Sequence, residues 1–177
     1  MYSTFGSPPC TATGYGGVVH GGSIFGELDL ARELIAAGGG FLRGRRPWAA
    51  LFCYEQVLQR FEFSSQPDLL LEVATAMIGK ACTFGYLKRQ EAALEMFDLV
   101  VQRFRDAWPL ELRAMAPRAL ACKAVRLCRI GRPISALVVC RELAEQFGQA
   151  DDAELQEAAR VGREIAGRAF YLLGRTK

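Results

Sequence analysis

The stretch LKRQEAALEMFDLVVQRF, residues 87–104, decides the fold because a similar stretch occurs three times in the chain. Residues 44–61 read GRRPWAALFCYEQVLQRF, and residues 130–147 read IGRPISALVVCRELAEQF, each 43 positions away. Counted from Ala93, the apolar side chains of the middle copy fall at offsets 0, 1, 4, 7, 8 and 11. That spacing marks one face of an α-helix and not a strand. Each copy is therefore predicted to be a helix.

The 43-residue period continues outside these three stretches. Recurring positions carry leucine at Leu69, Leu112 and Leu155, alanine at Ala50, Ala93 and Ala136, and a large apolar residue at Phe41, Phe84, Leu127 and Phe170. A period of 20–50 residues is typical of tandem arrays of small structural units. The sequence therefore predicts an all-α array.

Each unit is read as two helices joined by a short turn. Pro67 suits the first turn of a helix, and Asp68 adds favourable negative charge there. Gly131 suits the position just after a helix, and Pro133 can open the next one. First helices are expected at 26–42, 67–87, 109–129 and 152–173, and second helices at 47–61, 89–104 and 133–147.

This division gives a glycine-rich leader at 1–25 and a helical domain at 26–177. The domain contains three repeats and a half repeat, at 26–61, 67–104, 109–147 and 152–173. Three consecutive glycines, residues 38–40, fall inside the first helix. Each costs about 0.5–1 kcal/mol relative to alanine in a helix. We therefore expect that helix to be frayed, bent or ended early.

Small residues at Ala81, Ala124 and Gly167 share one position of the first helices, where two backbones can approach closely. Large apolar residues would fill the remaining space between helices. The side chains expected to be almost fully buried are Phe84, Phe97, Phe104 and Leu127.

A small residue three before an aromatic or leucine, a short turn, and then EAAL before a large residue resemble the tetratricopeptide repeat. The usual period of that family is 34 residues, and the longer period here resembles its extended bacterial variant. The resemblance covers about residues 26–173. It implies a right-handed superhelix of antiparallel helix pairs, an α-solenoid of about three and a half repeats. The Lys and Asn pattern with which some members bind acidic C-termini is not present.

The leader and the rest of the chain offer no set of residues for chemistry. His20, the single histidine, lies in TGYGGVVHGGSIFGE, residues 13–27, where a small hairpin is also conceivable. No nucleophile elbow or phosphate-binding motif accompanies it, and no Cys or carboxylate spacing completes a metal site. We therefore expect no catalytic residues, no cofactor and no metal, and hence no enzyme.

Composition narrows the setting of the protein. With 51% hydrophobic and 23% charged residues, the 177-residue chain is globular, and its net charge of +3 is too small to predict nucleic-acid binding. No secretory signal is apparent, and no uninterrupted apolar stretch reaches the roughly 20 residues that span a membrane. The six cysteines form no CxxC pair and are read as reduced thiols. A cytoplasmic location is expected.

Stacked helix pairs of this kind present a concave surface that binds peptides. The resemblance therefore implies an interaction scaffold whose first helices line the groove. Candidate groove residues are Thr75, Ile78, Cys82, Tyr86, Arg118, Ala121, Val125, Arg129, Glu164 and Arg168. The alternative is a fixed regulatory or docking subunit of a larger assembly.

The array stops halfway through its last repeat, since only GRTK follows the final first helix. Phe170, Leu173 and the surface near Gly167 should therefore be exposed in an isolated monomer. An apolar patch of this kind usually marks an interface. We expect this end to dock on a second copy or a partner helix, unless the leader covers it.

Overall fold

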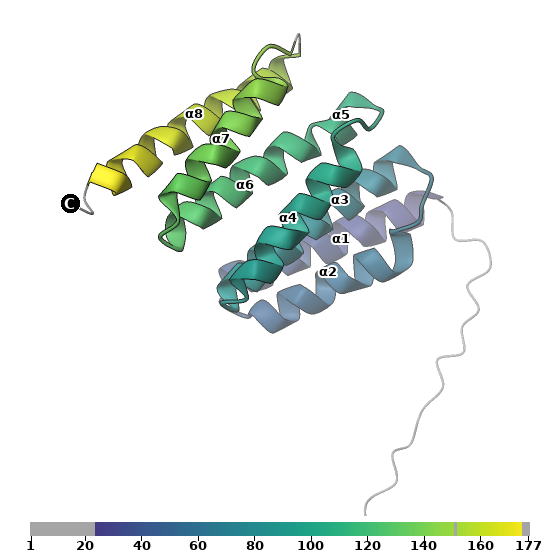
Figure 1. The fold of residues 1–177 in the computed structure, drawn as a ribbon. Helices are drawn as coiled ribbons and strands as arrows, with labels where there is room; N and C mark the ends of the chain where they lie inside the picture. The colour runs from purple at the N-terminus through teal and green to yellow at the C-terminus, as the bar shows by residue number, and fades with distance from the viewer. Residues whose placement is uncertain (1–23, 151, 175–177) are drawn as a thin grey trace, which may run out of the picture.

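The computed structural model describes residues 24–150 and 152–174, and these residues are all-helical, with no strand among them. The helices are α1 (Ile24–Arg43), α2 (Pro47–Phe61), α3 (Pro67–Tyr86), α4 (Gln90–Phe104), α5 (Leu110–Arg113), α6 (Met115–Arg129), α7 (Pro133–Phe147) and α8 (Ala153–Gly174). The long helices pack on their neighbours in chain order, and α1, α3, α6 and α8 also contact one another in turn. Helix α1 lies at one end of the molecule and α8 at the other (Figure 1).

The turns between paired helices share one backbone conformation. Arg45, Lys88 and Gly131 have φ angles of 57°, 60° and 76°, and they lie at equivalent positions of the 43-residue period. A residue in this left-handed region ends a helix, and glycine adopts it without strain. Prolines then occupy the first turn of α2, α3 and α7, where their missing N–H costs no hydrogen bond. Local chemistry thus sets the beginning and end of each helix.

Two of the three sets of residues that recur at the period are buried alike, whereas in the third Leu127 is buried, Phe41 and Phe84 are partly buried and Phe170 is exposed. The leucines at 69, 112 and 155 are 2%, 4% and 2% exposed, and the alanines at 50, 93 and 136 are fully buried. The small residues Ala81 and Ala124 are also buried. Gly167 is exposed instead, with open space where a Cβ would lie, because no described helix follows α8.

The expectation that the first helix is interrupted at its glycines is wrong. Helix α1 runs without a break from Ile24 to Arg43. Gly38 is buried, and a Cβ on it would lie 2.8 Å from the ring of Tyr54. Because the ring fills the space that a side chain would need, the helix gains packing there that offsets the low helix propensity of glycine.

The helix expected over 109–129 is divided into α5 and α6. Pro117 lies in the first turn of α6 and has no N–H to bond the carbonyl of Arg113. Proline also disfavours helical geometry in the chain before it. The helix therefore restarts at Met115, while the N–H of Ala114 closes α5 by bonding the carbonyl of Leu110 at 2.9 Å. The other expected helices are found, with ends shifted by at most two residues.

Three of the four expected core residues are confirmed. Phe97, Phe104 and Leu127 are 1%, 2% and 3% exposed. The fourth expectation is wrong, because Phe84 is only partly buried. Its ring accepts the ammonium of Lys80, whose Nζ lies 5.7 Å from the ring centroid.

Helix α3 is long and apolar enough to cross a membrane by length and composition, the one such helix among the described residues. Half of its most apolar window is buried inside the molecule, where α3 contacts α1, α2, α4 and α6. The core helix of a water-soluble protein has the same properties, so its apolar composition is explained by this packing.

Candidate functional site

Two adjoining pockets lie where α3, α6 and α8 meet, and the surface around them is called the α3–α6–α8 surface below. The first has a volume of about 230 Å³ and is lined by Cys82, Phe97, Ala121, Cys122, Val125, Arg126, Arg129, Val161 and Ile165. The second, of about 210 Å³, is lined by Val125, Cys128, Glu164, Ile165 and Arg168. Because Val125 and Ile165 line both, the two pockets form one continuous hollow.

Most of the predicted groove residues are brought together here. Cys82, Ala121, Val125 and Arg129 line the first pocket, and Val125, Glu164 and Arg168 line the second. Tyr86 lies one helical turn beyond Cys82 and is 56% exposed. Arg118 is exposed near the start of α6, and its charge acts on Cys82. These residues were selected by the family resemblance, which places the first helices along the groove, together with helical spacing.

Two predicted residues do not contribute to the hollow. Ile78 is 6% exposed and belongs to the hydrophobic core, so its placement in the groove is wrong. Helix α3 is covered by other helices on several sides, so only a narrow stripe of it is exposed, and Ile78 lies outside that stripe. Thr75 is half-buried, and its hydroxyl donates a 3.0 Å hydrogen bond to the carbonyl of Leu71 within the same helix.

Sequence reasoning missed Arg126, which projects from α6 across α3. Its Nη2 donates a 3.4 Å hydrogen bond to the carbonyl of Cys82. A Cβ on Gly85 would lie 2.1 Å from the guanidinium carbon, so only glycine leaves room for this side chain. The sequence signal that could have revealed this contact is Gly85 inside α3, together with the arginines of the neighbouring helix α6.

A second missed feature is a pair of thiols, Cys82 from α3 and Cys122 from α6. The hydrogen bond from Cys122 holds the pKa of Cys82 below its usual range, against the effect of burial, and the charges of Arg126, Arg129 and Arg118 act in the same direction. The same hydrogen bond and burial raise the pKa of Cys122. The pair therefore shares one thiolate, which forms first on Cys82.

The α3–α6–α8 surface combines apolar and cationic side chains. Apolar side chains such as Val125 and Ile165 line the two pockets together with the exposed arginines Arg129 and Arg168, and exposed Arg118 lies close enough for its charge to act on Cys82. None of these three guanidinium groups forms a hydrogen bond or ion pair within the described part of the chain. No group of three or more His, Cys, Asp or Glu side chains that could hold a metal occurs in residues 24–150 and 152–174. His20 and the rest of the leader lie outside the described residues.

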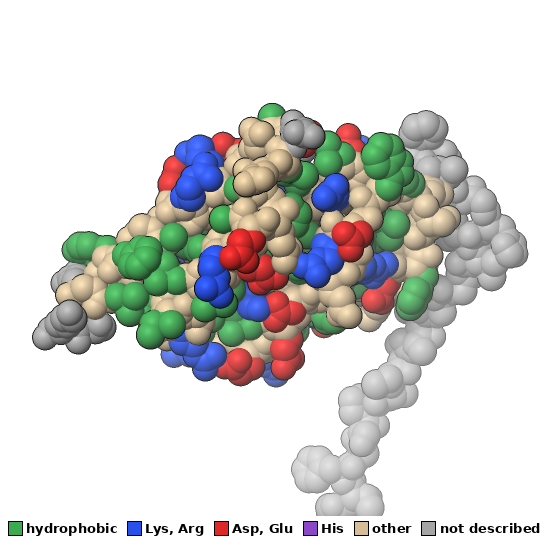
Figure 2. Space-filling view, turned by 45° about the horizontal axis from the view of Figure 1, so that its top comes forward, with side chains coloured by type: hydrophobic (Ala, Val, Ile, Leu, Met, Phe, Trp, Pro, Cys, Tyr) green, Lys and Arg blue, Asp and Glu red, His purple; other side chains and the backbone are tan. Residues whose placement is uncertain are grey.

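A third pocket, the largest of those described here, lies between α7 and α8. This C-terminal groove has a volume of about 450 Å³ and is lined by Ile134, Leu137, Val138, Cys140, Arg141, Ala144, Gly162, Arg163, Ala166 and Phe170. Hydrophobic side chains gather at this end of the molecule (Figure 2). Phe170 is 63% exposed, as expected. Leu173 is half-buried, so the expectation that it is exposed is wrong.

Comparison of the chain with protein-family models, with curated proteins and with solved structures found no match.

Proposed function

We propose that this chain is a non-enzymatic interaction scaffold that binds a peptide or protein partner on the α3–α6–α8 surface. In this proposal the helix pairs form a tetratricopeptide-like, right-handed superhelix of about three and a half repeats. The observation that carries the proposal is the continuous hollow whose two pockets share Val125 and Ile165. A hollow that extends across three helices suits an extended or helical segment of another protein.

The charge of the surface indicates the chemistry of the partner. Arg118, Arg129 and Arg168 have guanidinium groups that form no hydrogen bond or ion pair within the described residues, and a guanidinium binds a carboxylate through two parallel hydrogen bonds. Between them, Val125 and Ile165 provide apolar contact. The favoured partner segment therefore combines Asp or Glu with apolar side chains. Tyrosine and arginine are also the side chains that most often dominate interface energetics, which favours Tyr86 as an anchor.

Affinity capture from native lysate with two matched variants tests this proposal. Replacement of Tyr86, Arg118 and Arg129 by Ala should remove the proteins that the wild type captures. The control replaces Phe63, Arg60 and Arg113, an equivalent set of exposed side chains elsewhere, and should capture normally. Circular dichroism should show the same helix content in all three proteins.

The outcome also distinguishes scaffold from fixed subunit. A partner that dissociates as salt is raised fits a scaffold that uses charged contacts. An equimolar partner that stays bound in high salt would indicate a docking subunit of a larger assembly. Equal capture by the wild type and the first triple variant would refute the assignment of the site to this surface.

A further inference from the structure

Recurring charged contacts join the second helix of one repeat to the first helix of the next. Glu55 of α2 binds Lys80 of α3 at 3.4 Å, and Asp98 of α4 binds Lys123 of α6 at 2.5 Å. These two pairs are equivalent at the 43-residue period. The third equivalent pair, between α7 and α8, is Arg141 and Ala166, which cannot form an ion pair.

A second contact follows the same course. Arg89 lies over the ring of Trp48, 5.8 Å from its centroid, and Arg132 binds Glu91 at 2.7 Å. The equivalent residue on α7 is Ile134, which is 68% exposed. At the junction between α7 and α8, therefore, Arg141 stands where the earlier junctions have an acidic residue. Exposed Ile134 stands where they have Trp48 or Glu91. The junction between α7 and α8 therefore differs from the two earlier ones.

At this junction lies the C-terminal groove, which is apolar in the middle and cationic at its edges. Ile134, Val138 and Phe170 are 68%, 52% and 63% exposed, a contiguous set of large side chains around a concave space. Arg141 and Arg163 line the same groove and are exposed, and Arg141 also forms a 3.7 Å ion pair with Glu145 one turn along α7. An occupant must therefore combine small or apolar residues with acidic ones.

The opposite end of the molecule has that composition. On α1, the positions opposite the buried Ala31 and Gly38 are occupied by Asp29, Glu33, Ala36 and Gly40, all exposed. These residues follow one face of the helix at intervals of three or four. Neither Asp29 nor Glu33 forms an ion pair within the described residues, and a Cβ on Gly40 would meet nothing within 4 Å.

We propose that α1 of a second copy of this chain docks in the C-terminal groove, so that molecules associate head to tail. The acidic residues of α1 would approach Arg141 and Arg163, while Phe170 and Ile134 would face Ala36 and Gly40, which leave room for large side chains. The lengths agree, because α1 has 20 residues and α8 has 22, each about 30 Å long.

A symmetric pairing of two C-terminal grooves fits less well. In a two-fold dimer the same cationic surface meets itself, so the positive charges of Arg141 and Arg163 from both copies are brought into one interface. Like charges brought together in an interface are strongly unfavourable. Two concave surfaces also leave the space between them unfilled. Docking of α1 avoids both problems, because it joins surfaces of opposite charge and different shape.

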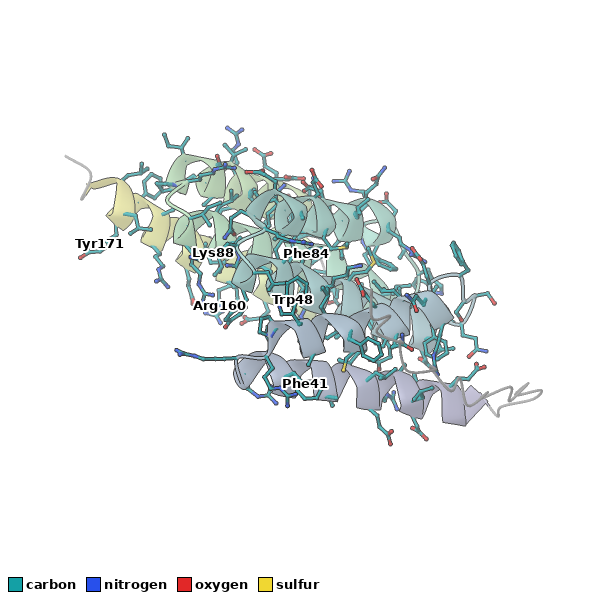
Figure 3. All side chains as sticks on the ribbon, turned by 90° about the horizontal axis from the view of Figure 1, so that it is seen from below. Phe41, Trp48, Phe84, Lys88, Arg160 and Tyr171 are labelled. Atoms are coloured by element: carbon teal, nitrogen blue, oxygen red, sulfur yellow. The ribbon has the colours of Figure 1, made fainter. Side chains whose placement is uncertain are left out.

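Head-to-tail contact uses two different surfaces, so each added copy leaves one of each kind free. Helices α1 and α8 lie at opposite ends of the array (Figure 1), and Figure 3 shows Tyr171 of α8 at the left margin, away from Phe41 of α1 in the lower part of the molecule. One chain therefore cannot close the contact on itself through its own helices. The average mass should therefore rise continuously with concentration, without a plateau at the mass of a dimer.

Light scattering with two blocked variants tests the proposal. Phe170→Glu places a charge in the groove, and the double variant Asp29→Lys/Glu33→Lys reverses the charge of α1. Each variant alone should remain at the monomer mass at concentrations where the wild type reaches several times that mass. An equimolar mixture should reach twice the monomer mass and no more. The intact α1 of one variant binds the intact groove of the other, and the resulting dimer has no further intact surface.

Phe63→Glu is the matched control, since Phe63 is 94% exposed away from both ends, and it should associate like the wild type. Added salt should reduce the mass of the wild type because charged contacts hold the junction. A wild type that stays monomeric throughout the concentration series would overturn the proposal. So would an α1 variant that still dimerises alone, which would indicate the symmetric pairing.

Discussion

The ring of Tyr54 makes Gly79 a sensitive position in the array. A Cβ on Gly79 would lie 2.5, 2.6 and 3.0 Å from three ring carbons of Tyr54. The ring cannot move aside easily, because Tyr54 is 4% exposed and also closely approaches Gly38. Gly79→Ala therefore forces an extra carbon into a filled space between α2 and α3.

The size of the effect follows from two opposing terms. Overpacking of this kind costs about 1–3 kcal/mol, while alanine in place of glycine gains about 0.5–1 kcal/mol in a helix. The midpoints give a net loss of about 1.3 kcal/mol in the free energy of unfolding. For a chain of this size that loss lowers Tm by about 3–5 °C.

Two companion variants isolate the cause. Gly40→Ala is also in a helix but has open space around it, so we expect a gain of about 0.5–1 kcal/mol. In a Tyr54→Leu background the clash is absent, and Gly79→Ala should become neutral or stabilising. Urea denaturation of the two single variants and the double-mutant cycle measures all of these values. A stabilising Gly79→Ala in the wild-type background would refute the reasoning.

Three further predictions concern single residues. Phe97→Ala should lower the free energy of unfolding by about 3–5 kcal/mol, because its side chain is 1% exposed, and partly exposed Phe84→Ala should cost less; equal losses in urea denaturation would contradict this. Lys88→Gly should stabilise by about 1 kcal/mol because it removes left-handed strain, and a lower Tm would count against that strain. Near pH 7, Cys82 should react with iodoacetamide faster than Cys140, because burial raises the pKa of Cys140 to about 11. The rate at Cys82 should fall as the pH is lowered through its pKa. Mass spectrometry of digests measures both rates, and faster reaction at Cys140 would contradict this prediction.

The helices could be predicted from the sequence because their signals are local. Apolar spacing, prolines and the residues after each helix depend on neighbours within a few positions, and they gave α2 and α7 to the residue. The error at the glycines of α1 arises because a distant side chain decides. Tyr54 of α2 packs against Gly38 of α1. A one-dimensional pattern contains no information about that contact.

The candidate site shows the same division. Placement of Cys82, Val125 and Arg129 on one surface followed from the family resemblance and helical spacing, whereas Ile78 was misplaced because the exact exposed stripe depends on how many helices surround α3. The thiol pair could not be predicted, since Cys82 and Cys122 are 40 positions apart and do not share a repeat position. Their contact depends on the rotation of α6 relative to α3.

Packing in chain order also has a consequence for how the molecule forms. The main contacts of α1 to α4 reach no further than α6, and the main contacts of α8 are with α6 and α7. Few contacts therefore wait for distant parts of the chain, which favours rapid folding. During synthesis, the helices that have left the ribosome already hold most of the partners they will ever have. Each later helix needs only to add itself to a surface that is already formed.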